Sequence, residues 1–389
     1  MSFMMITRRG FLRTAGASLA LGKLGCSPSL APEGGPKELI QRQDNPFNAE
    51  PRLDRLTESW VTPDRYFYVR SHGNQPDVNP DQYTLLVEGM VDRPLVLHLD
   101  DVERLPRVTV PATMQCAGNR RSEHSKTKAV GGVQWDAGAI GTAEWRGPRL
   151  SALLEKAGVK SGAKHVWFEG KDSVTLKDRQ TLFGGGVPIG KAMRPESILA
   201  VEMNGVPLPR EHGYPARTVV PGFIGARSVK WLGRIVVSDH PSENNFVARD
   251  YKLFPPEATP ETVKPENYDP IYDFVLSSAI TSPLAGATVS AGKVKVSGYA
   301  VPLGADGVTI ASVQVSGDGG ATWVPAELTG PEQAHCWRFW KASLTLGPGT
   351  PTLVVRAVDS RGQAQSEKAP WNFKGYLYNG WHRVPITVA

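Results

Sequence analysis

The sequence predicts an α+β protein in which a mixed domain of short strands and a few helices precedes an all-β sandwich. Three observations support this fold class. The 40 Gly and 32 Pro are spread along the 389 residues, which indicates many turns rather than a low-complexity tract. Apolar runs of strand length alternate with these turns from residue 66 to about residue 238. After a Pro- and Glu-rich passage, the apolar residues follow a period of two almost everywhere.

The first domain is predicted to cover residues 66–258. Strands are predicted at 83–88, 95–97, 166–169, 217–220 and 229–237, the last of them interrupted by Gly233. A helix is predicted at 150–157, because a helical apolar pattern there is closed by Gly158. The glycine run at 184–186 superficially resembles a nucleotide-binding loop. It lacks the strand–helix context and the downstream acid that such a loop needs, so we exclude that interpretation.

The second domain is predicted to cover residues 271–389, after a linker at 259–270 in a Pro- and Glu-rich passage. Its period-two strands are predicted at 289–296, 308–315, 337–346 and 352–358, each bounded by Gly, Pro or Asp. Short strands at this spacing are typical of an immunoglobulin-like sandwich. Residues 316–323 match an Asp-box hairpin, which in a single copy predicts a turn and not a propeller.

The N-terminal residues 1–31 read as a twin-arginine export signal. Arg8 and Arg9 precede a weakly apolar stretch at 15–24, which is shorter than the about 20 residues that span a bilayer. We therefore expect a periplasmic or other extracytoplasmic protein, not an integral membrane protein. Lipidation at Cys26 is the less favoured outcome. The Pro-rich residues 32–65 are predicted to form an extended lead-in.

Charge and cysteine content exclude several classes of protein. The formal net charge is +6, but residues 1–30 hold four basic residues and no acid, which leaves +6 − 4 = +2 for the rest. No basic stripe with interleaved aromatics follows, so we do not expect nucleic-acid binding. The sequence has three cysteines, no C-x-x-C-H motif for a c-type haem and no spaced Cys/His set for zinc. A disulfide between Cys116 and Cys336 stays open at this point.

The most informative segment contains Cys116 followed by Arg120 and Arg121. A cysteine beside small residues is more often a buried apolar residue than a ligand. Two nearby arginines favour its thiolate form, which binds soft or high-valent metals, and they supply positive charge for an anionic substrate. A papain-like nucleophile paired with His124 is the alternative that these residues leave open.

The segment 116–121 strongly resembles the molybdenum-binding signature of the sulfite oxidase family. The resemblance extends over roughly residues 66–389. Further matching segments, in the order of the family, are 67–72, Trp135, Trp145, 147–150, 168–173, 202–205, 211–217, 219–232, 249–252, 371–372 and 380–383. It implies a sulfite-oxidase-type molybdopterin domain followed by an immunoglobulin-like domain that commonly mediates dimerisation, in a homodimer or a heterodimer.

The resemblance also implies a cofactor and its ligands. Cys116 is expected to bind the molybdenum of a molybdenum–molybdopterin cofactor. The residues implied to hold the pterin and its phosphate are Tyr68, Arg70, His72, Asp172, His212, Arg217, Ser228 and Lys230. Basic residues suit this role because a buried phosphate needs charge-assisted hydrogen-bond donors. No haem is expected in this chain.

An anion pocket is implied next to the metal. Its expected members are Arg70, Arg121, Trp145, Tyr251 and Lys374. Sulfite is small and carries two negative charges near neutral pH, so it needs convergent cations. Lys374 departs from the family's sulfite oxidases, which usually have Arg at this position. A lysine keeps the charge but loses the planar two-point fork.

The predicted function is an exported sulfite dehydrogenase that oxidises sulfite to sulfate and passes electrons to a separate c-type cytochrome. A sulfur dehydrogenase subunit that acts on protein-bound sulfur is the first alternative. Nitrate reductase is less favoured, because that branch of the family generally lacks the tyrosine found here at Tyr251. A non-catalytic assembly module is a further alternative, which the complete set of site residues disfavours.

Overall fold

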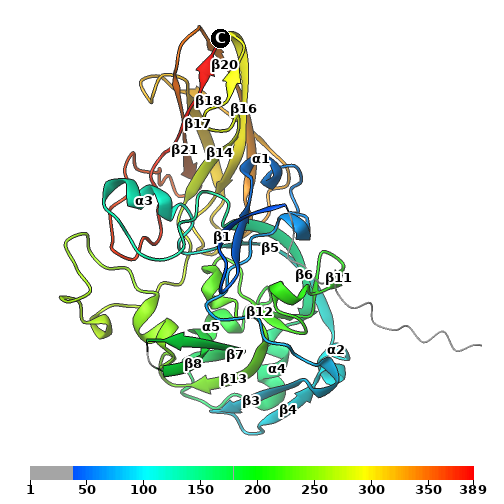
Figure 1. The fold of residues 1–389 in the computed structure, drawn as a ribbon. Coiled ribbons are helices and arrows are strands. Elements are labelled where there is room, and N and C mark those ends of the chain that lie inside the picture. The colour runs from blue at the N-terminus through cyan, green and yellow to red at the C-terminus, as the bar shows by residue number, and fades with distance from the viewer. Residues whose placement is uncertain (1–37, 178) are drawn as a thin grey trace, which may run out of the picture. The chain divides into compact units, whose positions relative to one another are not determined.

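The computed structural model describes residues 38–177 and 179–389 (Figure 1). The predicted export signal at 1–31 lies outside these residues. In the part described, strands outnumber helices and belong to mixed as well as antiparallel sheets, so the α+β fold class is confirmed. None of its helices is long and apolar enough to cross a membrane.

The predicted extended lead-in at 32–65 is wrong for residues 38–65. These residues form a hairpin of β1 (Leu39–Gln43) and β2 (Asn48–Pro51), then helix α1 (Leu53–Leu56) and the turn η1 (Asp64–Tyr66). Glu50 is buried and accepts hydrogen bonds from the backbone N–H groups of Asp136 and Gly138, both at 2.8 Å. A buried carboxylate needs hydrogen-bond donors, and Glu50 finds them in the first domain. Residues 38–65 therefore pack as part of that domain.

A five-stranded sheet, in the order β4-β3-β13-β7-β8, forms one side of the first domain (Figure 1). Its strands are β3 (Thr84–Gly89), β4 (Leu95–His98), β7 (His165–Leu176), β8 (Arg179–Pro188) and β13 (Leu232–Ser238). Strand β13 pairs parallel with β3 and antiparallel with β7, and its register shifts at Gly233. The short turn η2 (Pro80–Gln82) precedes β3, and helix α2 (Leu99–Glu103) follows β4.

Helix α4 (Leu150–Ala157) confirms the helix predicted from the apolar pattern. Leu150, Leu153, Leu154 and Ala157 are all buried, as the i, i+3, i+4, i+7 spacing requires. Gly158 ends the helix with a φ of +75°, a conformation that glycine adopts without steric cost.

A second sheet, in the order β11-β10-β6-β5, was not predicted from the sequence. Its strands are β5 (Arg107–Gln115), β6 (Ile140–Pro148), β10 (Glu202–Met203) and β11 (Val206–Pro207), and β9 (Ile198–Ala200) pairs with β12 (Arg217–Val219) beside it. Pro111, Gly141 and Gly147 interrupt the strand pattern. Gly147 is required, because a Cβ there would lie 1.9 Å from the carbonyl oxygen of Leu199.

The glycine run at 184–186 lies within β8, which agrees with our rejection of a nucleotide-binding loop. A Cβ on Gly184 would lie 2.6 Å from Nδ2 of Asn244, and one on Gly185 would lie 2.8 Å from Cγ2 of Val229. The glycines thus allow close approach of the chain around Val229 and Asn244. The short helix α5 (Ile189–Ala192) follows directly.

The C-terminal domain is the predicted all-β sandwich. One sheet has the order β14-β16-β20-β19 and the other β18-β17-β21-β22. The strands are β14 (Ser277–Ser282), β16 (Gly292–Val301), β17 (Ile310–Ser316), β18 (Val324–Pro325), β19 (Glu327–Thr329), β20 (Arg338–Leu346), β21 (Thr352–Asp359) and β22 (His382–Pro385), with β15 (Thr288–Val289) paired to β23 (Thr387–Val388). The Asp-box segment is the turn between β17 and β18, where Asp318 accepts from the backbone N–H of Ala321 and Thr322.

Residues 259–270 do not separate the two domains as a free linker. They include the turn η6 (Pro265–Asn267), and the ring of Tyr268 lies 5.0 Å from that of Phe254. Ile271, Phe274 and Trp337 of the C-terminal part belong to the same buried cluster as apolar residues of the first domain. The two domains therefore share a hydrophobic core.

Candidate functional site

Cys116 lies at the first position after β5, where the backbone is firmly held. Its N–H donates to the carbonyl oxygen of Ala139 at 2.9 Å and so extends the β5–β6 pairing by one residue. Its side chain is 6% exposed, and the N–H of Gly118 donates to Sγ at 3.4 Å. A backbone donor on sulfur stabilises a thiolate, which is the form that binds metal.

Cys116 opens into a cavity in the first domain that most of the predicted site residues line. Those residues are Tyr68, Arg70, His72, Asp172, His212, Arg217, Ser228, Lys230 and Tyr251. They come from loops and strand ends far apart in the sequence. Asp172 is on β7, His212 ends the turn η3 (Arg210–His212), and Ser228 follows the turn η4 (Gly225–Arg227).

Two buried or half-buried cations in this cavity have no acidic partner. Arg217 donates to the carbonyl oxygens of His212 at 2.9 Å and Ser228 at 3.0 Å. Lys230 donates to Oγ of Ser71 at 3.0 Å and to the carbonyl oxygen of Glu211 at 2.8 Å. None of the ion pairs in the described ranges includes either residue. Burial lowers the pKa of Arg217 to about 10. Burial and the charge of Arg217 lower the pKa of Lys230 to about 7, although the charges of Asp172 and Glu211 act in the opposite direction.

Two further polar atoms in the cavity lack partners within the described residues. They are Nε2 of His212 and Oδ1 of Asp172, and both side chains are buried. Burial lowers the pKa of His212 well below its usual range, so its imidazole is neutral. Burial raises the pKa of Asp172 to about 6, although the charge of Lys230 acts in the opposite direction. Buried polar atoms are rarely left unpaired, so these two atoms point to a ligand.

Tyr251 and His72 form a hydrogen-bonded pair at the edge of the cavity. The Tyr251 hydroxyl lies 2.8 Å from Nε2 of His72. Burial lowers the pKa of His72 well below its usual range, and the nearby charges of Arg70, Lys230 and Arg121 act in the same direction. Tyr251 follows the π-helical turn η5 (Phe246–Asp250).

Arg70 and His72 also line a second, more open hollow of about 610 Å³. Its other lining residues include Arg42, Pro46, Gly132 and Gln134, partly from the β1–β2 hairpin. The N-terminal hairpin thus contributes to the approach to the site.

Three predicted members of the anion pocket do not line the Cys116 cavity. Arg121 donates to the carbonyl oxygens of Val133 at 2.9 Å and Lys374 at 3.1 Å. Lys374 forms an ion pair with Asp250, with Nζ 2.6 Å from Oδ1. Trp145 is fully buried. The structure therefore brings Arg70 and Tyr251 to the cavity, whereas Arg121, Trp145 and Lys374 are not among the residues that line it.

Trp135, and not the predicted Trp145, has an indole N–H without a hydrogen-bond partner in the described residues. The indole N–H of Trp145 donates to the carbonyl oxygen of Ala112 at 3.3 Å, and Arg217 covers its ring at 4.9 Å. The indole N–H of Trp135 has no partner in the part of the chain described, and Trp135 packs in the same cluster as Tyr68 and Cys116. Trp135 follows the Cys116 segment in the sequence and could have been proposed for the site. Nothing in the sequence, however, showed that Trp135 rather than Trp145 has a free indole N–H.

Two buried arginines that sequence reasoning did not assign hold the loops of the site. Arg227 donates to the carbonyl oxygens of Phe246 at 3.0 Å and Ile271 at 2.8 Å, and so fixes the turn that carries Tyr251. Arg120 has a φ of +66° and donates to the C-terminal domain, at Gly380 (2.8 Å) and Trp381 (3.1 Å). The charge of Arg120 is therefore used between domains and is not available to an anion near Cys116.

The alternatives left open for the cysteines are resolved by their surroundings. Cys116 and Cys336 are both free and buried, so they form no disulfide. Nε2 of His124 lies 3.3 Å from the carbonyl oxygen of Tyr376, and burial lowers its pKa to about 4. His124 is thus engaged elsewhere, which disfavours a papain-like pair with Cys116.

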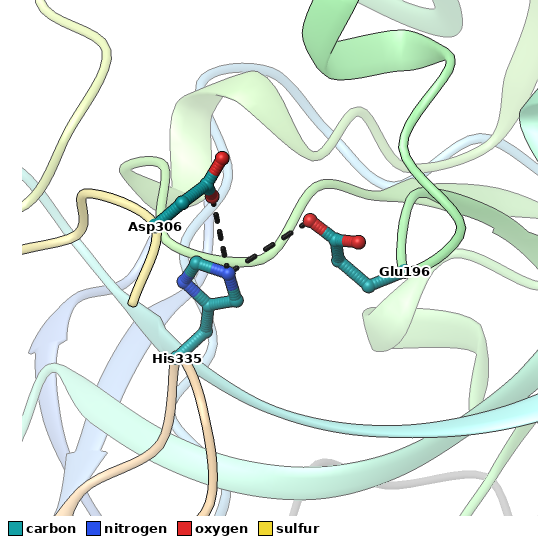
Figure 2. Close-up of side chains that lie close together, drawn as sticks. All are labelled: Glu196, Asp306 and His335. Atoms are coloured by element: carbon teal, nitrogen blue, oxygen red, sulfur yellow. Dashed lines mark ion pairs between the residues drawn. The ribbon is translucent and has the colours of Figure 1, made fainter. Parts of the chain in front are cut away.

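A second cluster with metal-binding residue types joins the two domains. Glu196, Asp306 and His335 converge on one another (Figure 2). Nζ of Lys191 lies 3.0 Å from Asp306 and 3.4 Å from Glu196, and Arg194 pairs with Asp306 as well. Because two cations already neutralise the two carboxylates, we assign no metal to this cluster.

The residues that line the cavity fit the chemistry of a molybdopterin cofactor. Uncompensated cations suit its phosphate, and the unpaired His212 and Asp172 atoms suit the polar edge of a pterin. Cys116 is the one cysteine among the cavity-lining residues of the described ranges, and its thiolate suits molybdenum. The cofactor, when bound, supplies the oxygen-transfer and two-electron chemistry.

Anion binding to the cofactor-free protein is expected to weaken by roughly three- to tenfold between about pH 5.5 and about pH 8.5. As the pH rises, Asp172 loses its proton near its pKa of about 6 and Lys230 loses its proton near about 7. Both losses make the cavity less positive, so both weaken anion binding as the pH rises. Sulfate keeps a constant charge over this range, and calorimetric titration with sulfate measures the effect.

A Lys230→Arg variant is the matched control, because arginine stays charged throughout. Its pH dependence should shrink to the part caused by Asp172. Equal binding by the unaltered protein at both pH values would contradict this account of the cavity.

The comparisons with known proteins agree with this reading of the cavity. Residues 72–246 match the oxidoreductase molybdopterin binding domain, and residues 268–389 match the Mo-co oxidoreductase dimerisation domain. The chain is 44% identical to mitochondrial sulfite oxidase of Homo sapiens over 357 residues, which cover 88% of this chain and 65% of that protein. It thus spans somewhat less than two thirds of the length of this relative.

Other relatives match over most of their length. The chain is 39% identical to sulfite oxidase of Arabidopsis thaliana over 366 residues, covering 88% of this chain and 92% of that one. Its structure is similar to the sulfane dehydrogenase SoxCD from Paracoccus pantotrophus, with a TM-score of 0.76 and 28% identity. That match covers 88% of this chain and 85% of the other. The chain therefore belongs to the sulfite oxidase family of molybdopterin oxidoreductases.

Proposed function

We propose that this protein oxidises sulfite to sulfate at a molybdenum–molybdopterin centre held by Cys116. The observation that carries the proposal is a buried thiol in a cavity whose cations Arg217 and Lys230 lack acidic partners in the described ranges. The reaction consumes one water and releases two electrons and two protons. The similarity to sulfite oxidases supports sulfite as the substrate.

The residues at the cavity edge have distinct tasks in this proposal. Arg70 lines both the cavity and the open hollow, so it meets an anion on its way in. The Tyr251 hydroxyl donates a hydrogen bond to an oxygen of the bound anion. In this proposal the neutral His72 donates from Nε2–H to the Tyr251 oxygen, so it holds that hydroxyl in place, adds no charge and leaves the hydroxyl proton for the anion.

The proposal includes export and a separate electron acceptor. The twin-arginine pattern at Arg8 and Arg9 supports an extracytoplasmic location. A c-type cytochrome is the proposed acceptor, because it takes single electrons outside the cytoplasm. Pairing through the C-terminal domain, in a homodimer or a heterodimer, is supported by its match to the dimerisation domain. Activity in the periplasmic fraction tests the proposed location, and the mass of the native assembly tests the proposed pairing.

Sulfite-dependent reduction of cytochrome c by the molybdenum-loaded protein tests the activity. We expect turnover with sulfite that is stoichiometric with sulfate formation. Absence of sulfite turnover in a preparation with full molybdenum content would contradict the proposal. Turnover with nitrate and a reduced donor would instead assign the protein to the nitrate reductase branch.

A sulfur dehydrogenase is the second candidate, and two observations favour it. The fold is similar to the sulfane dehydrogenase SoxCD, and the open hollow beside Arg70 and His72 has room for a carrier-bound sulfur group. Thiosulfonate on a peptide carrier is the discriminating substrate. A higher kcat/KM with this carrier than with sulfite would establish the second candidate.

A further inference from the structure

Strand β2 of the N-terminal hairpin holds the segment 69–72, which carries Arg70 to the cavity. Ala49 on this strand pairs with Val69 through two backbone hydrogen bonds, of 3.0 and 2.8 Å. Asn48 precedes Ala49, and its side chain extends the contact to the next two residues of the segment. The N-terminal hairpin therefore contacts the site through a side chain as well as through its backbone.

Asn48 is fully buried, and both hydrogen-bonding atoms of its side chain are used. Oδ1 accepts from the backbone N–H of Ser71 at 2.8 Å and from Nη1 of Arg70 at 3.2 Å. Nδ2 donates to the carbonyl oxygens of Pro46 at 2.9 Å and Ser71 at 3.1 Å, and to Oε1 of Gln43 at 3.1 Å. Because turning the amide would exchange donor and acceptor, these partners hold it in one orientation.

The contact with Asn48 orients Arg70 and leaves its charge intact. Arg70 forms no ion pair among residues 38–177 and 179–389. Its hydrogen bonds within those ranges both use Nη1, which donates to Oδ1 of Asn48 and to the carbonyl oxygen of Ser71. Both acceptors are neutral, so they hold one end of the planar guanidinium without cancelling its charge. Nε and Nη2 are left for an anion.

The backbone of the segment has further contacts besides Asn48. Val69 is held by the backbone of Ala49, and Oγ of Ser71 accepts from Nζ of Lys230 at 3.0 Å. Loss of the Asn48 amide should therefore leave the course of the segment in place. The main effect should fall on the side chain of Arg70, which loses the acceptor that orients it.

We propose that Asn48 is a positioning residue that orients Arg70 toward the incoming anion. It acts through Arg70 and does not touch the substrate, because it is fully buried and lines neither the cavity nor the open hollow. The inference rests on the proposed function, since it takes a sulfur oxyanion as the ligand. A neutral amide suits this role, because a carboxylate at the same place would pair with the guanidinium and cancel its charge.

Asn48→Ala is expected to raise the KM for sulfite roughly three- to tenfold in the molybdenum-loaded protein, with little change in kcat. The guanidinium keeps its charge but loses its orientation, so the bound anion and the transition state are weakened alike. The dissociation constant of sulfate, measured by calorimetry on the same preparation, should rise by a similar factor. An unchanged dissociation constant would overturn the proposal.

Asn48→Asp tests whether the amide must be neutral. Its carboxylate keeps an acceptor for the Ser71 N–H but pairs with Arg70, so sulfate should bind at least as weakly as in Asn48→Ala. Tighter binding of sulfate in Asn48→Asp than in Asn48→Ala would overturn the proposal.

A double-mutant cycle shows whether Asn48 acts through Arg70. Adding Asn48→Ala to Arg70→Met should change the dissociation constant of sulfate by less than about twofold. A further loss as large as that in the unaltered background would mean that Asn48 supports the site by another route, and the positioning role would be wrong.

Gln365→Ala is the matched control for the loss of a buried amide. Gln365 is buried in the C-terminal domain, where its side chain bonds to Ser278, Ala357 and Asn379. It lines neither the cavity nor the open hollow, so this variant should leave the KM for sulfite and the dissociation constant of sulfate unchanged.

Hydrogen exchange follows the same contact without any turnover. The N–H of Ser71 should exchange faster in Asn48→Ala, because its acceptor is lost. The N–H of Val69 should exchange as before, because the carbonyl oxygen of Ala49 still accepts from it. Faster exchange at both would show that the alanine variant has lost the hairpin. Asn48→Asp then decides, and sulfate binding as tight as in the unaltered protein would overturn the proposal.

Direct binding of sulfate separates this inference from the proposed function. If sulfite is not turned over but sulfate binding follows the expected pattern, the role of Asn48 stands and the substrate assignment fails. If sulfite is turned over but neither its KM nor sulfate binding responds to Asn48→Ala, the positioning role is wrong and the activity stands.

Discussion

Replacing Cys116 by serine is expected to lower sulfite-dependent turnover by more than about a hundredfold. Loss of a residue that merely orients a metal ligand typically lowers metal affinity or activity by about 10- to 100-fold. Loss of the ligand itself should therefore lower activity further. A serine hydroxyl is a poor substitute, because it stays protonated and is a harder donor than a thiolate. The rate of cytochrome c reduction with sulfite measures the effect.

The pterin should remain bound in the Cys116→Ser variant. Its proposed contacts, which include Arg217, Lys230 and His212, are not altered by the substitution. We therefore expect a normal pterin content with a changed molybdenum absorption spectrum. Loss of the pterin together with activity would mean that Cys116 supports the fold of the cavity and not the metal.

Cys336→Ser is the control for the loss of a buried thiol. Cys336 is as buried as Cys116, but its Sγ donates to the carbonyl oxygen of Pro111 at 3.4 Å outside the cavity. A serine can make the same hydrogen bond, so turnover should stay within about twofold. Equal losses in both variants would contradict the assignment of Cys116 as the ligand.

Replacing Arg120 by alanine is expected to lower the free energy of unfolding by about 3–5 kcal/mol. Arg120 is fully buried, and its Nε lies 2.6 Å from Oε1 of Glu123. Its guanidinium also donates to carbonyl oxygens of Ser278, Gly380 and Trp381 in the C-terminal domain. Removal leaves the carboxylate and these carbonyls without partners, and each buried unsatisfied group has a cost. Urea-induced unfolding measures the change.

Arg55→Ala is the matched control for this prediction. Arg55 and Glu58 form an ion pair with the same i,i+3 spacing, but both side chains are exposed. Such a pair contributes about 0.3–0.5 kcal/mol, so this variant should unfold almost like the unaltered protein. Similar losses in the two variants would show that the interdomain contacts of Arg120 contribute little. Hydrogen exchange of the 116–120 backbone should rise in Arg120→Ala alone, because the anchor of this loop is lost.

Local sequence patterns predicted part of the fold well. Helix α4 was predicted with its bounds, because apolar spacing and the terminal Gly158 are local signals. Strands β5 and β6 were missed, because Pro111, Gly141 and Gly147 break the strand pattern. The two glycines are needed for close packing, since a Cβ on either would clash with another segment. The linker at 259–270 was misjudged for a related reason, since a polar composition does not show that Tyr268 packs on Phe254.

By itself the sequence determined the fold class, the family resemblance and the residues around Cys116. It could not determine which of those charges are available to a ligand. Lys374 and Asp250 are 124 positions apart, and Arg120 reaches carbonyl oxygens more than 150 positions away. Whether a cation is free or neutralised depends on the distance to an acid from a remote segment, and only the tertiary structure decides that distance. In the described residues Arg217 and Lys230 form no ion pair and can meet an anion. Arg120 and Lys374 instead bind groups of the other domain.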